Sequence, residues 1–490
     1  MHPKSPPPQR ICPPHDWPLF DIAATRRLEQ IALAHSAEHD LMQRAGLATA
    51  RLALAMAPHS RTIWIAVGPG NNGGDGIHAA LHLHQWGKQV VVTSLGNPLQ
   101  MPPDASDANR RARAAGVSFA DAPPDKWDLC VDALLGIGAV RPPSGQMAQW
   151  ISRINEAPAP VLSIDMPTGL HADTGVAEPD TVRANATLCL LTLKPGLFTA
   201  DGRDHSIQVW LDDLQISAAS LLPELAASAR LSGAPASDTR RHATHKGSYG
   251  SLAVVGGAPG MTGAALLAAM AAVHAGAGKV FLCTLDNHPP VLSADHAELM
   301  QRDIAHIDPH GMTVVCGCGG GDRVRTYLPR LLSTAARLVL DADALNALAT
   351  DVQLQRLLRT RAARKLPSVL TPHPLEAARL LGVNSSRIQA DRIGAAQQIA
   401  ADYQCVVALK GSGTVIAAPG QTPRINPTGN ARLATAGTGD VLAGMVGATL
   451  TAGMPAFEAT CTAVYRHGAA ADRWPTNTAF SASRLANAPA

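Results

Sequence analysis

Residues 426–444, NPTGNARLATAGTGDVLAG, combine the elements of an anion site with a candidate base. Gly437 and Gly439 allow backbone N–H groups to point into open space, and an apolar helical pattern follows Asp440 directly. The first turn of a helix carries partial positive charge that attracts phosphate, and the Asp440 carboxylate can take a proton from a hydroxyl group held beside it. This arrangement predicts phosphoryl-transfer chemistry, although a bare GTGD is also compatible with an ordinary capped helix start.

A second polar loop, GPGNNGGDG, spans residues 68–76 and follows an apolar run at 62–67. Open parallel sheets bind ligands at the carboxyl ends of their strands, and this loop starts at such an end. Its glycines allow the backbone to wrap around a phosphate, while Asn71, Asn72 and Asp75 can contact hydroxyl groups or a cation. The glycine spacing differs from the dinucleotide-binding fingerprint, which argues against a conventional dehydrogenase.

Two further predicted strand ends carry an aspartate: Asp132 in VDALLGIG and Asp165 in SIDMPTGL. Each aspartate alone is more typical of a turn or a helix cap. Because the carboxyl ends of neighbouring parallel strands meet at one edge of a sheet, we expect both side chains to gather near the 68–76 loop. Oxygen atoms from Asn72, Asp132 and Thr168 suit a hard cation rather than a transition metal.

The C-terminal half repeats this pattern of polar groups after apolar runs. Asp341 and Asp343, in LDADALN, can position a ligand or Mg²⁺, with a capped turn as the alternative. His373 stands between two prolines, which hold it rigidly for a ligand contact. Lys410 opens the turn KGSGT, which can cradle a nucleotide phosphate.

Apolar runs of strand length alternate with helical patterns in two series, and this alternation predicts a mostly parallel, doubly wound, Rossmann-like α/β domain followed by a second α/β domain. The expected strands lie at 62–67, 90–95, 129–135, 161–164 and 186–193, and then at 251–255, 279–284, 312–317, 336–340, 368–370, 405–410 and 413–417. We expect a disordered N-terminus at 1–18, domains at 19–217 and 240–474, a linker at 218–239 and a flexible C-terminus at 475–490.

Composition narrows the class of protein. The chain has 490 residues, 46% of them hydrophobic, and a net charge of +3, which gives no support for a nucleic-acid or membrane-surface partner. No signal peptide or membrane-spanning run is predicted, and the eight cysteines include no CxxC pair. We therefore expect a cytoplasmic protein with reduced thiols, with no nucleic-acid or membrane partner, that forms a homo-oligomer.

The motifs GPGNNGGDG, LMQRAG, VDALLGIG and SIDMPTGL together resemble the epimerase domain of the NAD(P)H-hydrate repair enzymes over about residues 20–215. The resemblance implies that Asp165 is catalytic and that Asn72, Asp132 and Thr168 bind K⁺, with Thr168 standing where the family usually has serine. The residues implied to contact the hydrates of NADH and NADPH (NADHX and NADPHX) are Asn71, Asn72, Gly73, Gly74, Asp75, Gly136, Ile137, Gly138, Ala139, Val140, Arg141, Pro142 and Asp165.

The motifs HKGSYG, LDADALN, TPHPLEAARLL, KGSGT and NARLATAGTGDVLAG resemble the dehydratase domain of the same enzymes, which has a ribokinase-like fold, over about residues 240–473. Together the two resemblances imply epimerisation of the R and S hydrates. They also imply dehydration of the S form with ADP and Mg²⁺, giving AMP and phosphate. Asp440 is the implied base. Implied nucleotide contacts are Lys410, Gly411, Ser412, Gly413, Thr414 and Gly439, and implied hydrate contacts are Ala264, Gly319, His373 and Asp440. Cys318 and Leu375 stand where proline and glycine are usual.

Two other functions remain open at this point. A ribokinase-like small-molecule kinase with an N-terminal nucleotide-binding module would use the same GTGD chemistry, with ATP as donor and a stable phosphorylated product. A non-enzymatic protein would carry the N-terminal domain as a binding module beside a degenerate partner. The presence of both Asp165 and Asp440 argues against that alternative.

Overall fold

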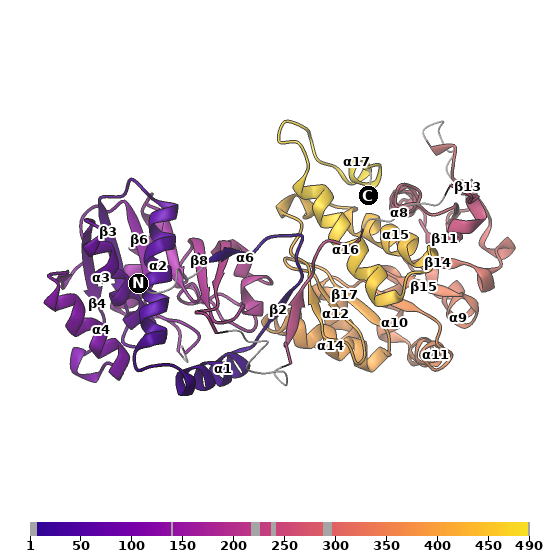
Figure 1. Cartoon of the computed structure of the whole chain (residues 1–490). Coiled ribbons are helices and arrows are strands. Elements are labelled where there is room, and N and C mark those ends of the chain that lie inside the picture. The colour runs from indigo at the N-terminus through magenta and orange to yellow at the C-terminus, as the bar shows by residue number, and fades with distance from the viewer. Residues whose placement is uncertain (1–6, 139–140, 217–225, 237–241, 288–295, 489–490) are drawn as a thin grey trace. The chain divides into compact units, whose positions relative to one another are not determined.

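The computed structural model describes residues 7–138, 141–216, 226–236, 242–287 and 296–488 (Figure 1). The chain divides into two compact units. The first comprises residues 1–12 and 17–230, and the second comprises residues 13–16 and 231–490. The division at residue 230 falls inside the stretch predicted to be a linker.

The first unit is built on an eight-stranded sheet in the order β1-β9-β8-β7-β6-β3-β4-β5. Its pairings are parallel from β5 through to β9, and β1 adds antiparallel to β9. The strands are β1 (Gln9–Arg10), β3 (Thr62–Val67), β4 (Gln89–Ser94), β5 (Ser118–Ala120), β6 (Leu129–Ala133), β7 (Val161–Ile164), β8 (Ala184–Leu190) and β9 (Ser206–Asp212).

Helices cover both faces of this sheet, and strand β3 shows why. Its residues Ile63, Ile65 and Val67 pack into one core, while Trp64 and Ala66 pack into a second core on the opposite face. A strand buried on both faces reads as a continuous apolar run, as the sequence does here. The helices are α1 (Ile22–His35), α2 (Asp40–Met56), α3 (Asn71–Gln85), η1 (Pro98–Gln100), α4 (Pro103–Ala114), α5 (Gln146–Glu156), η2 (Pro195–Leu197) and α6 (Gly202–His205).

The strands of the second unit run in the order β13-β12-β11-β14-β15-β16-β17-β18-β19. They are parallel from β13 to β17, and β18 and β19 continue antiparallel. Their bounds are β11 (Ser251–Gly256), β12 (Lys279–Thr284), β13 (Met300–Gln301), β14 (Thr313–Cys316), β15 (Arg337–Leu340), β16 (Ser368–Leu370), β17 (Val406–Leu409), β18 (Val415–Ala417) and β19 (Arg424–Ile425).

This second sheet is also doubly wound, because Ala253 and Val255 of β11 face one core while Leu252 and Val254 face the other. Helices α8 and α16 contribute to one of these cores, and α11 and α14 contribute to the other (Figure 1). The helices are η3 (Lys246–Tyr249), α8 (Thr262–His274), η5 (Ile304–His306), η6 (Pro309–Gly311), α9 (Val324–Thr334), α10 (Asp343–Thr350), α11 (Val352–Ala363), α12 (Pro374–Leu381), α13 (Ser385–Ala390), α14 (Arg392–Tyr403), η7 (Ala431–Leu433), α15 (Thr438–Thr451), α16 (Ala456–Asp472) and α17 (Ala482–Ala486). The predicted fold class, two successive α/β domains, is confirmed.

The terminal segments contain regular structure where the sequence predicts loose chain. Residues 9–10 form β1, residues 17–19 form β2 (Trp17–Leu19), and β10 (Ala229–Leu231) lies at the division between the units. Near the C-terminus, Ala482, Leu485 and Ala486 of α17 are buried in the core that contains α8. Elements of two to five residues are too short to show a hydrophobic period. In the described ranges, no helix is long and apolar enough to cross a membrane.

Candidate active sites

The first candidate site is a cavity of about 470 Å³ in the first unit. Residues after β3, β6 and β7 line it, together with residues of α1 and α2. Helix α3 begins here at Asn71 with Gly70 as its N-cap, and no side chain caps it. Its first backbone N–H groups therefore remain available to an anionic ligand. The predicted residues that line this cavity are Asn71, Asn72, Asp75, Gly136, Ile137, Gly138 and Asp165.

The other predicted hydrate contacts in this unit do not line the cavity or lie outside the described residues. Gly73 and Gly74 belong to the packed side of α3: a Cβ on Gly73 would lie 2.1 Å from the Gly68 carbonyl oxygen, and one on Gly74 would lie 2.5 Å from the Met42 side chain. Arg141 and Pro142 are exposed and absent from the cavity lining, and residues 139 and 140 (Ala139 and Val140) lie outside the described ranges.

Asp165 follows β7 and makes two contacts that fix its carboxylate. Its Oδ1 accepts a hydrogen bond from Lys194 Nζ, and its Oδ2 accepts one from Ile137 N at 3.2 Å. Lys194 is completely buried and also donates to the Leu190 carbonyl oxygen at 2.9 Å. No sequence motif pointed to Lys194. A lysine at the end of the apolar run 186–193 was its only signal.

Four carboxyl groups line the same cavity: Glu29, Asp75, Asp104 and Asp165. Burial, followed by the charge of Asp165, raises the pKa of Asp75 well above its usual range. Burial and then Asp165 also raise the pKa of Glu29. The cavity therefore pairs an ion-paired carboxylate with carboxyl groups that favour their protonated forms.

Two of the predicted K⁺ ligands, Asp132 and Thr168, are in direct contact. Asp132 is fully buried, and its carboxylate accepts from Thr168 N at 2.9 Å and from Thr168 Oγ1 at 2.7 Å. Burial raises the pKa of Asp132, and its hydrogen-bond partners are neutral groups, so a nearby cation would offset the cost of its charge. Asn72, the third predicted ligand, lies beside Gly136, and its buried Nδ2 lacks a hydrogen-bond partner among the described residues. These oxygen donors fit a hard cation.

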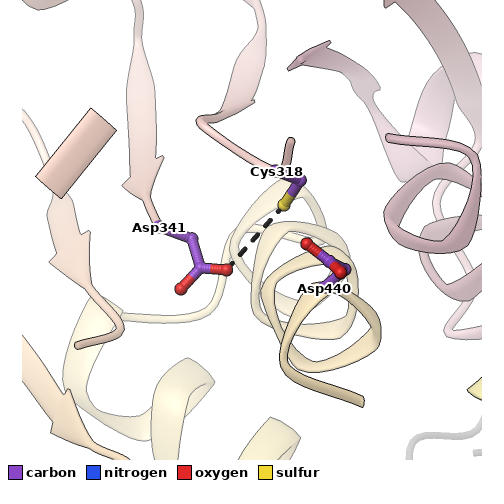
Figure 2. A group of neighbouring side chains, drawn as sticks. All are labelled: Cys318, Asp341 and Asp440. Carbon is purple, nitrogen blue, oxygen red and sulfur yellow. Dashed lines mark hydrogen bonds between the residues drawn. The ribbon is translucent and has the colours of Figure 1, made fainter. Parts of the chain in front are cut away.

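The second candidate site lies in the second unit, where α15 begins near the ends of β14, β15 and β17. One ligand atom from each of Cys318, Asp341 and Asp440 lies within 4.8 Å of the other two. Figure 2 shows the three side chains converging from two strand ends and the first turn of α15, with the Cys318 thiol donating to Asp341 at 3.9 Å. Lys410 Nζ bonds Asp341 Oδ1 at 2.7 Å and would lie 3.4 Å from a Cβ on Gly439. The lysine thus adds positive charge at the start of α15.

Burial governs the protonation of this site. Burial, and then the charge of Asp341, raises the pKa of Asp440 to about 6. Burial also raises the pKa of Glu376 to about 7, and it raises the pKa of the Cys318 thiol well above its usual range. For Lys410, burial alone would lower the pKa, but Asp341 and Glu376 outweigh it and the pKa is raised. Asp440 is thus poised as a base near neutral pH beside a permanent cation.

His373 has a structural task as well as its predicted place at the site. Its Nδ1 accepts from Leu375 N at 3.0 Å, and its backbone N–H donates to Glu376 Oε2 at 2.7 Å, which forms a capping box for α12. Its Nε2 lies 3.3 Å from Glu376 Oε1. The Leu375 side chain, at a position where the family usually has glycine, is exposed.

The remaining predicted residues form two small groups. A Cβ on Gly319 would lie 2.9 Å from the Ala264 Cβ, so these two residues are neighbours. Gly411, Ser412, Gly413 and Thr414 form the turn after β17, where Thr414 Oγ1 donates to the Gly411 carbonyl at 3.2 Å. The buried Arg392 donates to the Lys410 carbonyl at 3.1 Å and so anchors this turn. Arg392 lies outside the sequence motifs and therefore could not be predicted from them.

Two family models match the chain: NAD(P)H-hydrate dehydratase over residues 252–488 and YjeF-related protein N-terminus over residues 38–196. The bifunctional NAD(P)H-hydrate repair enzyme of Coxiella burnetii is 34% identical over 471 residues, which is 93% of this chain and 94% of that protein. The ADP-dependent (S)-NAD(P)H-hydrate dehydratase of Neisseria meningitidis is 43% identical over 254 residues, or 50% of this chain and 84% of that protein.

Among solved structures, the ADP/ATP-dependent NAD(P)H-hydrate dehydratase of Bacillus subtilis is 32% identical with a TM-score of 0.44, and it covers 51% of this chain and 90% of that one. The similarity to the bifunctional relative extends over nearly the whole of both proteins, and the two family models match the two units in order. The chain therefore belongs to the family of bifunctional NAD(P)H-hydrate repair enzymes.

Proposed function

We propose that this protein interconverts the R and S hydrates of NADH and NADPH and dehydrates the S form at the expense of ADP, giving AMP and phosphate. The observation that carries the proposal is Asp440, a base with a pKa of about 6 in the first turn of α15, beside the Lys410–Asp341 ion pair. A base, a cation and the N–H groups of a helix start are the parts that phosphoryl transfer requires.

In the dehydratase step, Asp440 takes the proton of the hydrate's hydroxyl group as that oxygen attacks the terminal phosphorus of ADP and AMP leaves. The first N–H groups of α15 and the Lys410 ammonium stabilise the transferring phosphoryl group. The ring nitrogen then supplies an electron pair that expels phosphate, and a proton leaves the adjacent carbon to give NADH or NADPH. Hydroxide is a poor leaving group and phosphate a good one, which explains why ADP is consumed.

We assign Lys410, Gly411, Ser412, Gly413, Thr414 and Gly439 to the adenine nucleotide and Ala264, Gly319, His373 and Asp440 to the hydrate. The carboxylate of Asp341, beside the base, suits Mg²⁺, which usually takes one or two carboxylates together with phosphate oxygens. When bound with the nucleotide, Mg²⁺ would neutralise part of the phosphate charge.

We assign the epimerase reaction to the cavity of the first unit, with Asp165 at the reacting carbon. The start of α3 would hold the substrate phosphates, and Asn72, Asp132 and Thr168 would supply oxygens to K⁺, which would screen the buried Asp132 carboxylate. We also propose that the protein is cytoplasmic and forms a homo-oligomer. Its functional domains would span residues 19–217 and 240–474.

Two isosteric variants test the division of labour between the units. Asp440→Asn should stop ADP-dependent recovery of NADH from the S hydrate. Interconversion of R and S, which is measured by chromatography, should continue. Asp165→Asn should reduce interconversion to its spontaneous rate and leave recovery from the S form unchanged. Loss of both activities in either variant, with the protein folded, would contradict the assignment of one reaction to each unit.

A further inference from the structure

Lys194 is a fully buried cation that contacts Asp165, a residue of the cavity lining. Its side chain is 0% exposed, and its ammonium lies between Asp165 Oδ1 and the Leu190 carbonyl oxygen. A buried ammonium group is costly unless it is paired and hydrogen-bonded. Since Lys194 gives up contact with solvent to reach Asp165, its position calls for an explanation in the chemistry of that carboxylate.

Asp165 itself is held in an unusual conformation. Its φ is 65°, in the left-handed region that residues other than glycine rarely adopt. Its backbone N–H is fixed by the Leu188 carbonyl at 2.7 Å. Lys194 occupies Oδ1, and Oδ2 accepts a hydrogen bond from Ile137 N. Oδ2 also lies 3.2 Å from the position that a Cβ on Gly136 would take, at the cavity wall. Backbone strain of this kind clusters at functional sites, where it aims a side chain.

The charged groups around Asp165 come from several elements. Glu29 and Arg26 belong to α1, Asp75 to α3 and Asp104 to α4, and all of them line the cavity. Burial and the charge of Asp165 both favour the protonated form of Asp75. Asp75 therefore lies in the same cavity as an Asp165 carboxylate that is paired with the Lys194 ammonium, and two carboxyl groups in different environments can serve as an acid and a base in one reaction.

We propose that Lys194 is a positioning residue for epimerisation, which holds Asp165 as an oriented carboxylate while Asp75 acts as the proton donor in the same cavity. This inference rests on the proposed assignment of epimerase activity to the first unit. Lys194 acts only through Asp165, because its complete burial keeps it from the substrate.

The reaction balances without any added oxidant or reductant. Asp75 donates its proton to the hydrate's hydroxyl oxygen, the C–O bond breaks with its electron pair going to oxygen, and the ring nitrogen's lone pair forms a C=N bond. After this water molecule has left, a water molecule adds to the opposite face of the same carbon. That water gives its proton to Asp165, and the C=N electron pair returns to nitrogen. Transfer of the proton from Asp165 to Asp75 through water restores the starting state.

The test compares Lys194→Met with the full-length wild type. We expect the epimerase kcat of the variant to fall by about 100-fold, the scale of one acid–base contribution, with KM within about twofold. The acid limb of its pH profile should move to higher pH, because the carboxylate has lost its cationic partner. Lys194→Arg should restore part of kcat and return the acid limb toward its wild-type position. Lys126→Met, which removes an exposed lysine of the same unit, should leave both parameters unchanged.

Thermal unfolding followed by circular dichroism reports whether the first unit of the variant is folded, and dehydration of the S hydrate by the same protein sample reports on the second unit. If Lys194→Met does not fold, Asp75→Asn, which preserves shape, still tests the scheme: it should remove the basic limb of the kcat profile together with about 100-fold of kcat. A Lys194→Met enzyme with wild-type kcat and pH profile, or an Asp75→Asn enzyme that retains the basic limb, would overturn the inference. Absence of epimerisation in the wild type would instead overturn the proposed function.

Discussion

At the scale of the residue, the protonation state of Asp440 determines what the dehydratase site can do. Burial raises its pKa to about 6, and the neighbouring Asp341 carboxylate adds to that effect. A base with this pKa is mostly ionised at neutral pH, yet it is strong enough to accept a proton from a hydroxyl group. Its location in the first turn of α15 places it where a phosphoryl group would be stabilised.

Replacing Asp440 by Asn should abolish dehydration and stabilise the fold. Loss of the base should lower kcat by at least about 100-fold. A folded-state pKa above the normal value means that the ionised carboxylate costs stability at neutral pH, so a neutral amide should raise Tm. The measurements are ADP-dependent recovery of NADH and thermal unfolding at pH 7. Full turnover by Asp440→Asn would show that another group is the base.

The pH dependence of dehydration follows from the same group. Because Asp440 must be ionised to act, kcat should be constant above neutral pH and fall tenfold per pH unit below about 6. The pH profile of kcat with saturating ADP and S hydrate measures this directly. An acid limb centred near the normal aspartate value of about 4 would contradict the proposed environment of Asp440.

The sequence motifs identified Asp165 and Asp440 but not their partners. Lys194 lies 29 residues from Asp165, and Lys410 lies 69 residues from Asp341, so each ion pair forms only when the sheet brings distant strand ends together. The capping box that His373 forms with Glu376 could not be predicted either, because the sequence suggested only a ligand contact for His373.

At the scale of the element, both sites depend on a loop that lets a helix start close to a strand end. After β3, Gly68 passes so near the next strand's loop that a Cβ would lie 1.8 Å from the Leu134 carbonyl oxygen. Only glycine allows this approach, and it brings the start of α3 to the cavity. Alternation of apolar runs predicted these strands, whereas the close approach could not be inferred without the partner backbone.

Gly68→Ala should therefore disturb the first unit. The clash with backbone should lower the free energy of unfolding by about 1–3 kcal/mol and reduce epimerase activity, while dehydration continues. Gly70→Ala provides a stability control in the same loop, because nothing lies within 4 Å of its Cβ position. Thermal unfolding of both variants measures the difference. Equal Tm values for the two variants would contradict the close approach of Gly68 to Leu134.

At the scale of the whole molecule, the chain joins two doubly wound units, each with cores on both faces of its own sheet and with its own site. Hydrophobic periodicity predicted this organisation because both sheets are buried on both faces. It missed β1 and α17, which are too short to carry a period.

Whether one chain repairs both hydrates can be measured in a single reaction. The purified protein is incubated with an R and S mixture of NADH hydrate, ADP and Mg²⁺, while absorbance of reduced nicotinamide and formation of AMP are followed. We predict complete recovery of both epimers with one AMP formed per NADH, at a rate above the spontaneous interconversion measured with Asp165→Asn. Recovery of the R fraction no faster than with Asp165→Asn would contradict the epimerase assignment. A stable phosphorylated product formed from ATP, without NADH, would contradict the account as a whole.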